Sequence, residues 1–548
     1  MKLVRLKINK KFRSLPEGFE INFREDKPNV NWEKFHPFCF AGLNGSGKSN
    51  VLEALANIFY HLECCTLNEN YSDYLKNDFD NKKSEVDSYE LEYYIIPRDS
   101  NKKSFEDYQR IFLKKEEGDT PYINITKESF ADLKFQPVAN SIRSFLPELV
   151  IGYSSGENEI LSLPFVKSKL LQFDEYLYHI KENADYELET KPESSLTYMD
   201  YHSSQAILLS NFLLQNEDAL IRIKEQLEIE KLHSFRLVIN NHRLYEPTEI
   251  PEIDYLLPKV EDTIVKLRKC ATVNYVEREV SGDDKGNIKF EYLDFYFNSK
   301  TKEAFKKHFD NPLKLFRAFQ VLSLLNLRIL DKKLKKEIYN SDSLYAMYKI
   351  PAPKEVEHVF HFNLFKLKKE KSNDKMLLKA FSDGEHQFLH TMGICLMLQN
   401  KSALFLLDEP ETHFNPQWRS EFISVLKDSL DKSNSNSLMQ DILITSHSPF
   451  IISDCLPDKV IIFKKGEDPI RPQFNTFGTS ISIITSKIFE SNRTIGEFSN
   501  NQIKEFEKFF KDLNYNDALS ILNAKVGDSV EKLLFINEMK NKYNSKNA

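Results

Sequence analysis

Residues 42–49, with the sequence GLNGSGKS, fit the pattern G-x-x-x-x-G-K-S in full. The chain has only 15 glycines among 548 residues, and three of them fall within this segment. Glycines allow backbone N–H groups to turn inward around a phosphate, while Lys48 would neutralise phosphate oxygens and Ser49 would offer its hydroxyl to Mg²⁺. An ordinary glycine turn would need neither the Lys-Ser pair nor the apolar run that precedes it. We therefore expect a binding site for ATP, formed by Asn44, Gly45, Ser46, Gly47, Lys48, Ser49 and Asn50.

An apolar run at residues 404–407 ends in two carboxylates, Asp408 and Glu409. In P-loop NTPases a strand of this kind lies beside the phosphate loop, and its aspartate positions the Mg²⁺ ion. We therefore expect Asp408 and Ser49 to hold the metal, and Glu409 to orient or deprotonate the attacking water. An exposed Asp-Glu pair after a strand is common, so this prediction depends on its pairing with the phosphate loop.

A second apolar strand, residues 442–445, ends in Ser446, His447 and Ser448. His447 follows the acidic pair along the chain, at a strand end where it could hydrogen-bond the γ-phosphate and respond to its hydrolysis. A lone histidine is more often structural, but this placement favours a functional role. The expected catalytic residues are Lys48, Glu409 and His447.

Residues 381–387, FSDGEHQ, open a predicted helix shortly before the acidic strand. A serine cap, a flexible glycine and free helix N–H groups form an anion site, although a plain N-cap is the alternative. A second S-x-G-E segment, residues 154–157, lies far upstream, and we interpret it as a Q-loop-like segment or a turn on the nucleotide side of the sheet. The nucleotide-contacting residues expected at the later segment are Ser382, Gly384 and Glu385.

The elements that must position these motifs follow from hydrophobic patterning. Residues 1–24 alternate as strands do, and a buried strand at 38–41 leads through the phosphate loop into a helix at about 49–62. Residues 66–130 are polar apart from a strand-like run at 89–96, and we expect surface loops around a strand pair.

The middle of the chain carries no nucleotide motif. An apolar strand at 149–153 is followed by a long region with helical patterns and a β-hairpin at 272–297. The expected fold class is α/β: a P-loop ATPase head with a mixed sheet flanked by helices, interrupted by a mostly helical α+β insertion domain. The expected domains are 1–165 and 376–470 for the two parts of the head, 166–375 for the insertion and 471–548 for a helical C-terminal assembly region.

Composition limits the possible classes of protein. The formal charge of −7 and the pI near 6.1 exclude a chain that is basic overall, so any nucleic-acid contact must be a local patch. Residues 1–7 hold no apolar run long enough for a signal peptide, and no run could cross a membrane, so we expect a cytoplasmic protein. The six cysteines show no C-x-x-C spacing, which argues against a zinc or redox motif.

The motifs resemble those of ABC-type ATPases of the OLD/RecF/SMC branch. The resemblance is carried by residues 408–416, DEPETHFNP, by 445–450, TSHSPF, and by 12–15, FRSL, where the family's arginine approaches phosphate. It covers roughly residues 1–65 and 375–480. It implies that Arg13 contacts the nucleotide, and that Ser382 and Gly384 reach across a head-to-head dimer to the ATP of a second copy.

Within this branch the order and size are most similar to the PtuA-type ATPases of Septu and retron anti-phage defence systems. That resemblance implies a homodimer or higher oligomer, a partner HNH nuclease of the PtuB type and, in retron versions, a reverse transcriptase with its DNA–RNA product. OLD nucleases carry a Toprim domain after the ATPase. Here residues 466–469, GEDP, contain no D-x-D, so no intrinsic nuclease activity is expected.

Residues 299–340 contain eleven Lys or Arg against four Asp or Glu. On a helix, such lysines could track nucleic-acid phosphates, or they could be an ordinary solvated face. The alternative to a defence role is a DNA-repair or structural ATPase that clamps DNA without a nuclease. The lysines in question are Lys332, Lys333, Lys335 and Lys336.

Overall fold

The computed structural model contains a parallel sheet, two antiparallel sheets and flanking helices, which confirms the expected α/β class. The structure describes the chain except for residues 25–31, 33, 99, 101–106, 127–133, 156–160, 183–194, 247–252, 279–287, 344–348, 352–353, 355–356, 371–374, 399–400, 432–439, 492–494, 510–512 and 548. Its described residues divide into two compact units, Met1–Phe477 and Gly478–Ala548. The expected division of the head and insertion stays a prediction.

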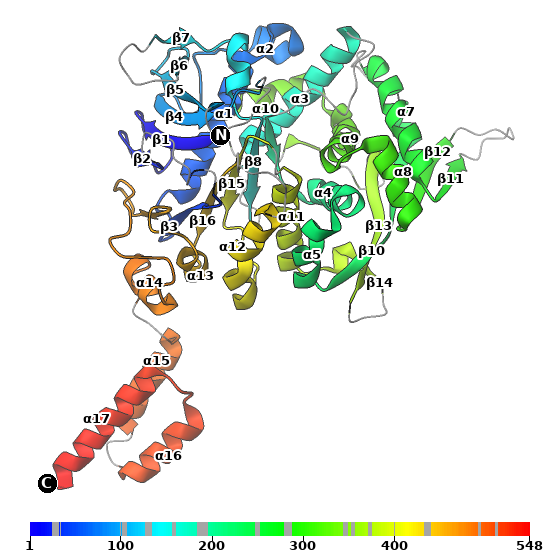
Figure 1. The fold of residues 1–548 in the computed structure, drawn as a ribbon. Helices are drawn as coiled ribbons and strands as arrows, with labels where there is room; N and C mark the ends of the chain where they lie inside the picture. Colours follow the sequence, from blue (N-terminus) through cyan, green and yellow to red (C-terminus); the bar gives the residue numbers. More distant parts are fainter. Residues whose placement is uncertain are drawn as a thin grey trace. The chain divides into compact units, whose positions relative to one another are not determined.

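The parallel sheet organises the first unit (Figure 1). Its strand order is β17-β3-β16-β15-β8-β9, and every neighbouring pair is parallel. Because parallel strands share one direction, their carboxyl ends meet at one edge, where ligands of open α/β sheets bind. The strands are β3 (Phe38–Gly42), β8 (Leu149–Ser154), β9 (Leu196–Tyr198), β15 (Ala403–Asp408), β16 (Asp441–Ser446) and β17 (Val460–Phe463).

Helix α1 (Lys48–Thr66) lies between the parallel sheet and an antiparallel sheet, and one hydrophobic core joins all three. This explains why its residues are apolar around most of its circumference, since a helix covered on several sides has no wet face. Phe59 of α1, for example, packs edge-on against Tyr93 at 6.0 Å between ring centroids. The antiparallel sheet has the order β2 (Glu20–Asn22), β1 (Lys2–Ile8), β4 (Tyr89–Ile95), β5 (Gln109–Lys115), β6 (Tyr122–Thr126) and β7 (Gln136–Pro137).

This antiparallel sheet confirms the strand expected at 89–96, which forms β4, and corrects the expectation that surface loops surround a single strand pair within residues 66–130. β4, β5 and β6 are consecutive paired strands, and Ile111, Leu113 and Ile123 are fully buried. Some of the polar residues of these strands are themselves buried, among them Glu92, Lys115 and Asn124. The alternation of apolar and polar residues along β5 and β6 is the sequence signal that would have predicted these strands.

A third sheet, also antiparallel, lies in the middle of the chain. Its order is β11 (Val273–Arg278), β12 (Ile288–Tyr296), β10 (Ile229–Asn240), β13 (Phe360–Lys369) and β14 (Lys375–Leu377), which includes the expected hairpin. Helices of the first unit are α2 (Asp73–Asn77), α3 (Leu163–Glu182), α4 (Tyr201–Leu214), α5 (Glu217–Gln226), α6 (Asn241–Leu244), α7 (Ile253–Cys270), α8 (Ser299–Phe309), α9 (Pro312–Leu324), α10 (Lys332–Tyr339), α11 (Asp383–Met397), α12 (Pro416–Asp431) and α13 (Pro449–Ser453).

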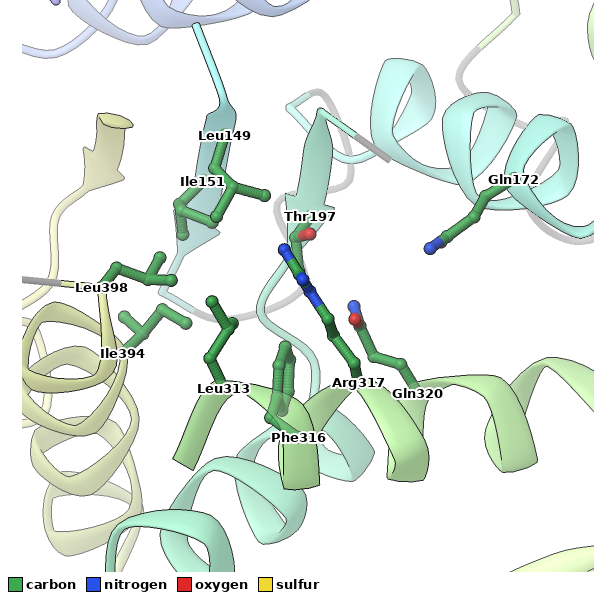
Figure 2. Close-up of a pocket in the computed structure, with 10 residues that line it drawn as sticks. All are labelled: Leu149, Ile151, Gln172, Thr197, Leu313, Phe316, Arg317, Gln320, Ile394 and Leu398. Carbon is green, nitrogen blue, oxygen red and sulfur yellow. The ribbon is translucent and has the colours of Figure 1, made fainter. Parts of the chain in front are cut away.

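The middle region packs closely against the parallel sheet. Asn211 of α4 donates to the Gly393 carbonyl of α11 at 2.9 Å, and a cavity of only about 20 Å³ remains where β8, β9, α3, α9 and α11 meet. Figure 2 shows Arg317 of α9 reaching toward Thr197 of β9 at this junction. The parallel sheet also takes in β9, which falls inside the range expected to be an insertion.

The second unit is helical, as expected for the C-terminal region. It consists of α14 (Ile481–Ile488), α15 (Glu497–Phe509), α16 (Tyr515–Lys525) and α17 (Val530–Asn547), around a small core of Ile503, Ala518, Leu522 and Phe535.

Candidate nucleotide site

The phosphate loop leaves β3 at Gly42 and enters α1 at Lys48. A Cβ on Gly42 would lie 2.3 Å from the Phe463 carbonyl oxygen, so the close passage of β17 requires glycine here. Gly45 and Gly47 have φ of 71° and 99°, a left-handed conformation that glycine adopts without strain. The expected strand–loop–helix is therefore confirmed, and the start of α1 points its N–H groups into the loop.

Lys48 extends back across this loop. Its Nζ donates to the carbonyls of Gly42 and Leu43 at 3.1 Å each. Burial lowers the pKa of Lys48, while the nearby carboxylates of Glu409 and Asp408 oppose that shift. The lysine is thus a desolvated cation beside the acidic strand, where it interacts strongly with a phosphate.

Asp408 is the point at which three elements converge. Its carboxylate accepts hydrogen bonds from the hydroxyls of Ser49 at 2.7 Å, Thr445 at 2.7 Å and Ser154 at 3.3 Å. The parallel register aligns Asp408 directly with Thr445 on one side and Ser154 on the other. The expected pair of Ser49 and Asp408 is therefore brought together, and these oxygen donors fit Mg²⁺, which prefers hard oxygen ligands.

Glu409 and His447 form a second pair next to Asp408. His447 Nε2 lies 3.4 Å from Glu409 Oε1, and the two side chains are 30% and 35% exposed. The hydrogen bond from His447 lowers the pKa of Glu409, against a smaller opposing effect of burial. The backbone of Glu409 has φ 48°, and its N–H donates to the Thr445 hydroxyl at 2.9 Å. An ionised carboxylate that remains accessible is suited to act as a general base.

Glu411 is a site residue that sequence reasoning did not single out. It is only 4% exposed, and burial raises its pKa to about 7. Its Oε1 accepts from the Ser446 hydroxyl, which in turn accepts from the Ser448 N–H at 2.9 Å. Its Oε2 has no hydrogen-bond partner in the described part of the chain. Glu411 therefore fixes the turn that carries His447.

The segment opening α11 is a capping box. Ser382 caps the helix, and Glu385 accepts from the Ser382 N–H at 2.8 Å while pairing with Lys369 at 2.6 Å. A Cβ on Gly384 would lie 2.6 Å from the His413 carbonyl oxygen, which explains why this position is glycine. Ser382 and Glu385 thus bond to each other and to Lys369. Their contact with a nucleotide in a second copy stays a prediction.

Gln387 connects this helix with the acidic turn. Its amide donates to the Glu409 carbonyl at 3.4 Å and accepts from the His413 N–H at 3.2 Å. No spacing rule could have identified it, because its partners lie more than 20 residues away. A shift of α11 would consequently move the backbone of the proposed base.

The segment FRSL forms a turn against the phosphate loop. Ser14 donates to Asn50 at 2.5 Å, and a Cβ on Gly47 would lie 3.1 Å from Leu15 and from Ser14. Arg13, with φ 52°, pairs with Glu53 of α1 at 3.0 Å. The resemblance is thus correct in placing the turn near the loop, while the contact of Arg13 with phosphate stays a prediction.

Most of the lysines expected to form a basic patch have partners inside the fold. On α10, Lys335 is buried and pairs with Asp174 at 2.7 Å, while Lys332 and Lys336 pair with Asp73 and Asp78. Lys333 is exposed. The helix is therefore attached to α2 and α3 by its charges, and a nucleic-acid contact here stays a prediction. Of the earlier S-x-G-E segment, Gly156 and Glu157 lie outside the described residues.

Residues 193–453 match the family model described as "AAA domain, putative AbiEii toxin, Type IV TA system". The match contains the acidic strand, the α11 segment and His447 and begins after the phosphate loop. A curated relative, protein ea59 of Escherichia phage lambda, is 26% identical over 158 residues. That segment is 28% of this chain and 29% of ea59, so the chain aligns with less than a third of that relative.

Heads of Smc proteins are among the solved structures that resemble the chain. An Smc head bound to the C-terminal winged-helix domain of ScpA is 10% identical, with 86% of this chain and 98% of that chain covered, at a TM-score of 0.32. A Pyrococcus furiosus Smc head bound to the C-terminal domain of ScpA is 12% identical, with 86% and 96% covered, at the same TM-score.

The family match and the site geometry agree on the class: the chain carries a P-loop ATPase domain that binds ATP. No helix among the described residues has the length and apolar character to span a membrane.

Proposed function

We propose that this protein hydrolyses ATP as an ABC-type ATPase, and that it dimerises around the nucleotide to control a partner nuclease in anti-phage defence. The observation that supports hydrolysis best is the convergence of the Ser49, Thr445 and Ser154 hydroxyls on Asp408, with Glu409 and His447 adjacent. It joins the phosphate loop to the acidic strand in one site.

Each residue of the site has a defined task in this proposal. Lys48 neutralises the β- and γ-phosphate oxygens, while Ser49 and Asp408 would hold Mg²⁺. When bound, the ion supplies charge stabilisation to the phosphates. Glu409 accepts the proton of the attacking water, and His447 orients Glu409 and contacts the γ-phosphate from the end of β16.

Dimerisation is proposed because the helix-opening segment of α11 offers N–H groups and a serine but bonds to Lys369 rather than to the phosphate loop of its own chain. Ser382 and Gly384 would complete the ATP site of a second copy. The partner nuclease and the cytoplasmic location are supported by the resemblance of the motifs. The description of the matching family, which names a toxin of a TA system, is consistent with a protein that works with a partner.

Substitution Glu409→Gln tests the hydrolytic site. We expect phosphate release to fall at least about 100-fold, because a general base typically contributes that much or more, while ATP binding persists. Light scattering with size-exclusion chromatography should show an ATP-dependent dimer that accumulates in the variant. Glu421→Gln is the matched control, because Glu421 is a carboxylate of α12 away from the site that accepts a hydrogen bond from Gln417 at 3.1 Å. Turnover near wild type in Glu409→Gln would refute the assignment.

Co-purification of the untagged chain from its own cells tests the partner. Recovery of a small nuclease, dependent on ATP-site integrity, supports control of an effector. Recovery of DNA alone, without a second protein, would instead favour an ATPase that clamps DNA.

A further inference from the structure

A cavity of about 540 Å³ lies along the middle of α1, apart from the phosphate loop. Its walls come from the end of β1, from α1, from the segment that follows α2, from α3 and from the end of α10. Its volume falls within the range of small-molecule sites. Since α1 starts at Lys48 and reaches the cavity at Asn57–His61, the two sites are roughly 15–20 Å apart along one helix.

The cavity is lined by buried polar groups that lack a partner in good hydrogen-bond geometry. Lys167 of α3 is 5% exposed, and its Nζ lies 3.9 Å from the carboxylate of Glu85. Among the described residues, the Tyr60 hydroxyl, the Ser84 hydroxyl and His61 Nδ1 have no partner that meets hydrogen-bond geometry, although Tyr60 interacts with Cys64 and Tyr74, and His61 with the Asn81 backbone. Tyr60 and His61 are themselves 7% and 3% exposed. Buried polar groups are normally paired, so this cluster indicates a site for a ligand.

The chemistry of these groups selects an anionic ligand. An ammonium and two hydroxyls are hydrogen-bond donors, and donors that line one half-closed cavity match an oxyanion. Of the five carboxylates in the wall, Asp78 pairs with Lys336 at 2.7 Å, Asp87 pairs with Lys115 at 2.9 Å and Asp80 lies 4.0 Å from Lys83, while Glu85 faces Lys167.

The remaining wall is aromatic and suits the planar part of a ligand. Tyr74 and Tyr339 stack on each other at 4.1 Å between ring centroids, and Phe79 packs edge-on against Tyr74 at 5.9 Å. All three line the cavity. Donors for an oxyanion and aromatic rings in the same cavity describe a phosphate ester with a planar body.

We propose that this cavity is a second ligand site, which binds a phosphorylated molecule of mononucleotide size. The phosphate is held by Lys167, Tyr60 and Ser84, and the planar body lies against Tyr74 and Phe79. The site does not depend on ATP hydrolysis at the phosphate loop. Because both sites share α1, the ligand is positioned to alter how the loop binds ATP.

Isothermal titration calorimetry on the full-length protein tests this site, with AMP and inorganic phosphate as probes. We expect saturable AMP binding that is tighter than phosphate binding. Lys167→Met should weaken AMP binding at least tenfold and Tyr60→Phe several-fold, while Glu85→Gln should tighten it by removing the competing carboxylate. Lys48→Ala, which disables the phosphate loop, should leave AMP binding unchanged.

Three results would overturn the proposal: AMP binding that Lys167→Met and Tyr60→Phe both leave unchanged, AMP binding that Lys48→Ala abolishes, or phosphate binding as tight as that of AMP. Thermal unfolding of each variant verifies its fold. Tyr60→Phe removes a single oxygen and keeps the ring, so it remains informative if Lys167→Met does not fold. Opposite effects of Glu85→Gln and Lys167→Met on AMP affinity separate a ligand site from a purely structural ion pair.

Discussion

Replacement of the buried carboxyl of Glu411 by an amide should make this protein more stable at alkaline pH. Burial raises the pKa of Glu411 from 4.5 to about 7, so the folded state favours the protonated, neutral side chain. Glu411→Gln is nearly isosteric with that neutral form and can still accept the hydrogen bond from Ser446.

The sign follows from the raised pKa. The stability that the protonated carboxyl contributes is fully present below pH 4.5 and is lost as the pH rises through about 7. The rise in pKa corresponds to about 3 kcal/mol of unfolding free energy, at about 1.4 kcal/mol for each pH unit. Above pH 7 the unfolding free energy of the wild-type protein is therefore lowered by that amount, whereas that of the Glu411→Gln variant is not.

Urea unfolding of the first unit, followed by tryptophan fluorescence at pH 5 and pH 8.5, measures this difference. We expect Glu411→Gln to exceed wild type by about 3 kcal/mol at pH 8.5, and the gap to shrink to about 1 kcal/mol or less at pH 5. Glu409→Gln is the matched control. The pKa of Glu409 is lowered by His447, so its ionised form contributes stability at neutral pH that is lost as the pH falls through its folded pKa.

The two variants should therefore change stability in opposite directions at pH 8.5. A Glu411→Gln protein that is less stable than wild type at pH 8.5, or a difference that does not vary with pH, would refute the account of Glu411. It would mean that the carboxylate is ionised in the fold and has a compensating partner.

Three further outcomes follow from the same contacts. Thr445→Val removes one of the hydroxyls that donate a hydrogen bond to Asp408. We expect the rate of ATP hydrolysis, measured by phosphate release, to fall about tenfold. We expect the free energy of unfolding, measured by urea titration, to fall by about 1–2 kcal/mol. Gly384→Ala places a methyl group 2.6 Å from a backbone oxygen, so unfolding should become easier by about 1–3 kcal/mol, and an unchanged urea midpoint would contradict the tight packing. Lys335→Met should destabilise the fold while Lys333→Met does not, and salt-sensitive binding of DNA that depends on both equally would support the nucleic-acid role for α10.

The sequence by itself determined the parts of the site whose chemistry is local. The phosphate loop needs glycines at φ values that few other residues adopt, followed by a lysine and a serine at the start of a helix, and all of this lies within eight residues. The acidic strand and the strand before His447 were predicted for a similar reason, since an apolar run ending in polar residues describes a buried strand with a reactive end.

Only the tertiary structure decided which distant residues complete that site. Asp408 gains Ser154 and Thr445 because the register of three parallel strands aligns them, and strand order is a long-range property that no local pattern encodes. Gln387 and Glu411 acquire their roles in the same way, through contacts across the acidic turn and the end of β16.

The same distinction explains which strands and contacts the sequence did not reveal. The strands within residues 66–130 are short and half polar, so their pairing is stabilised by burial against α1 rather than by intrinsic preference. The acidic partners of Lys332, Lys335 and Lys336 could not be identified from the sequence, because Asp73, Asp174 and Asp78 are remote in the chain; a nucleic-acid contact of α10 stays a prediction. Charge along a sequence shows what a helix carries, whereas the fold decides what those charges contact.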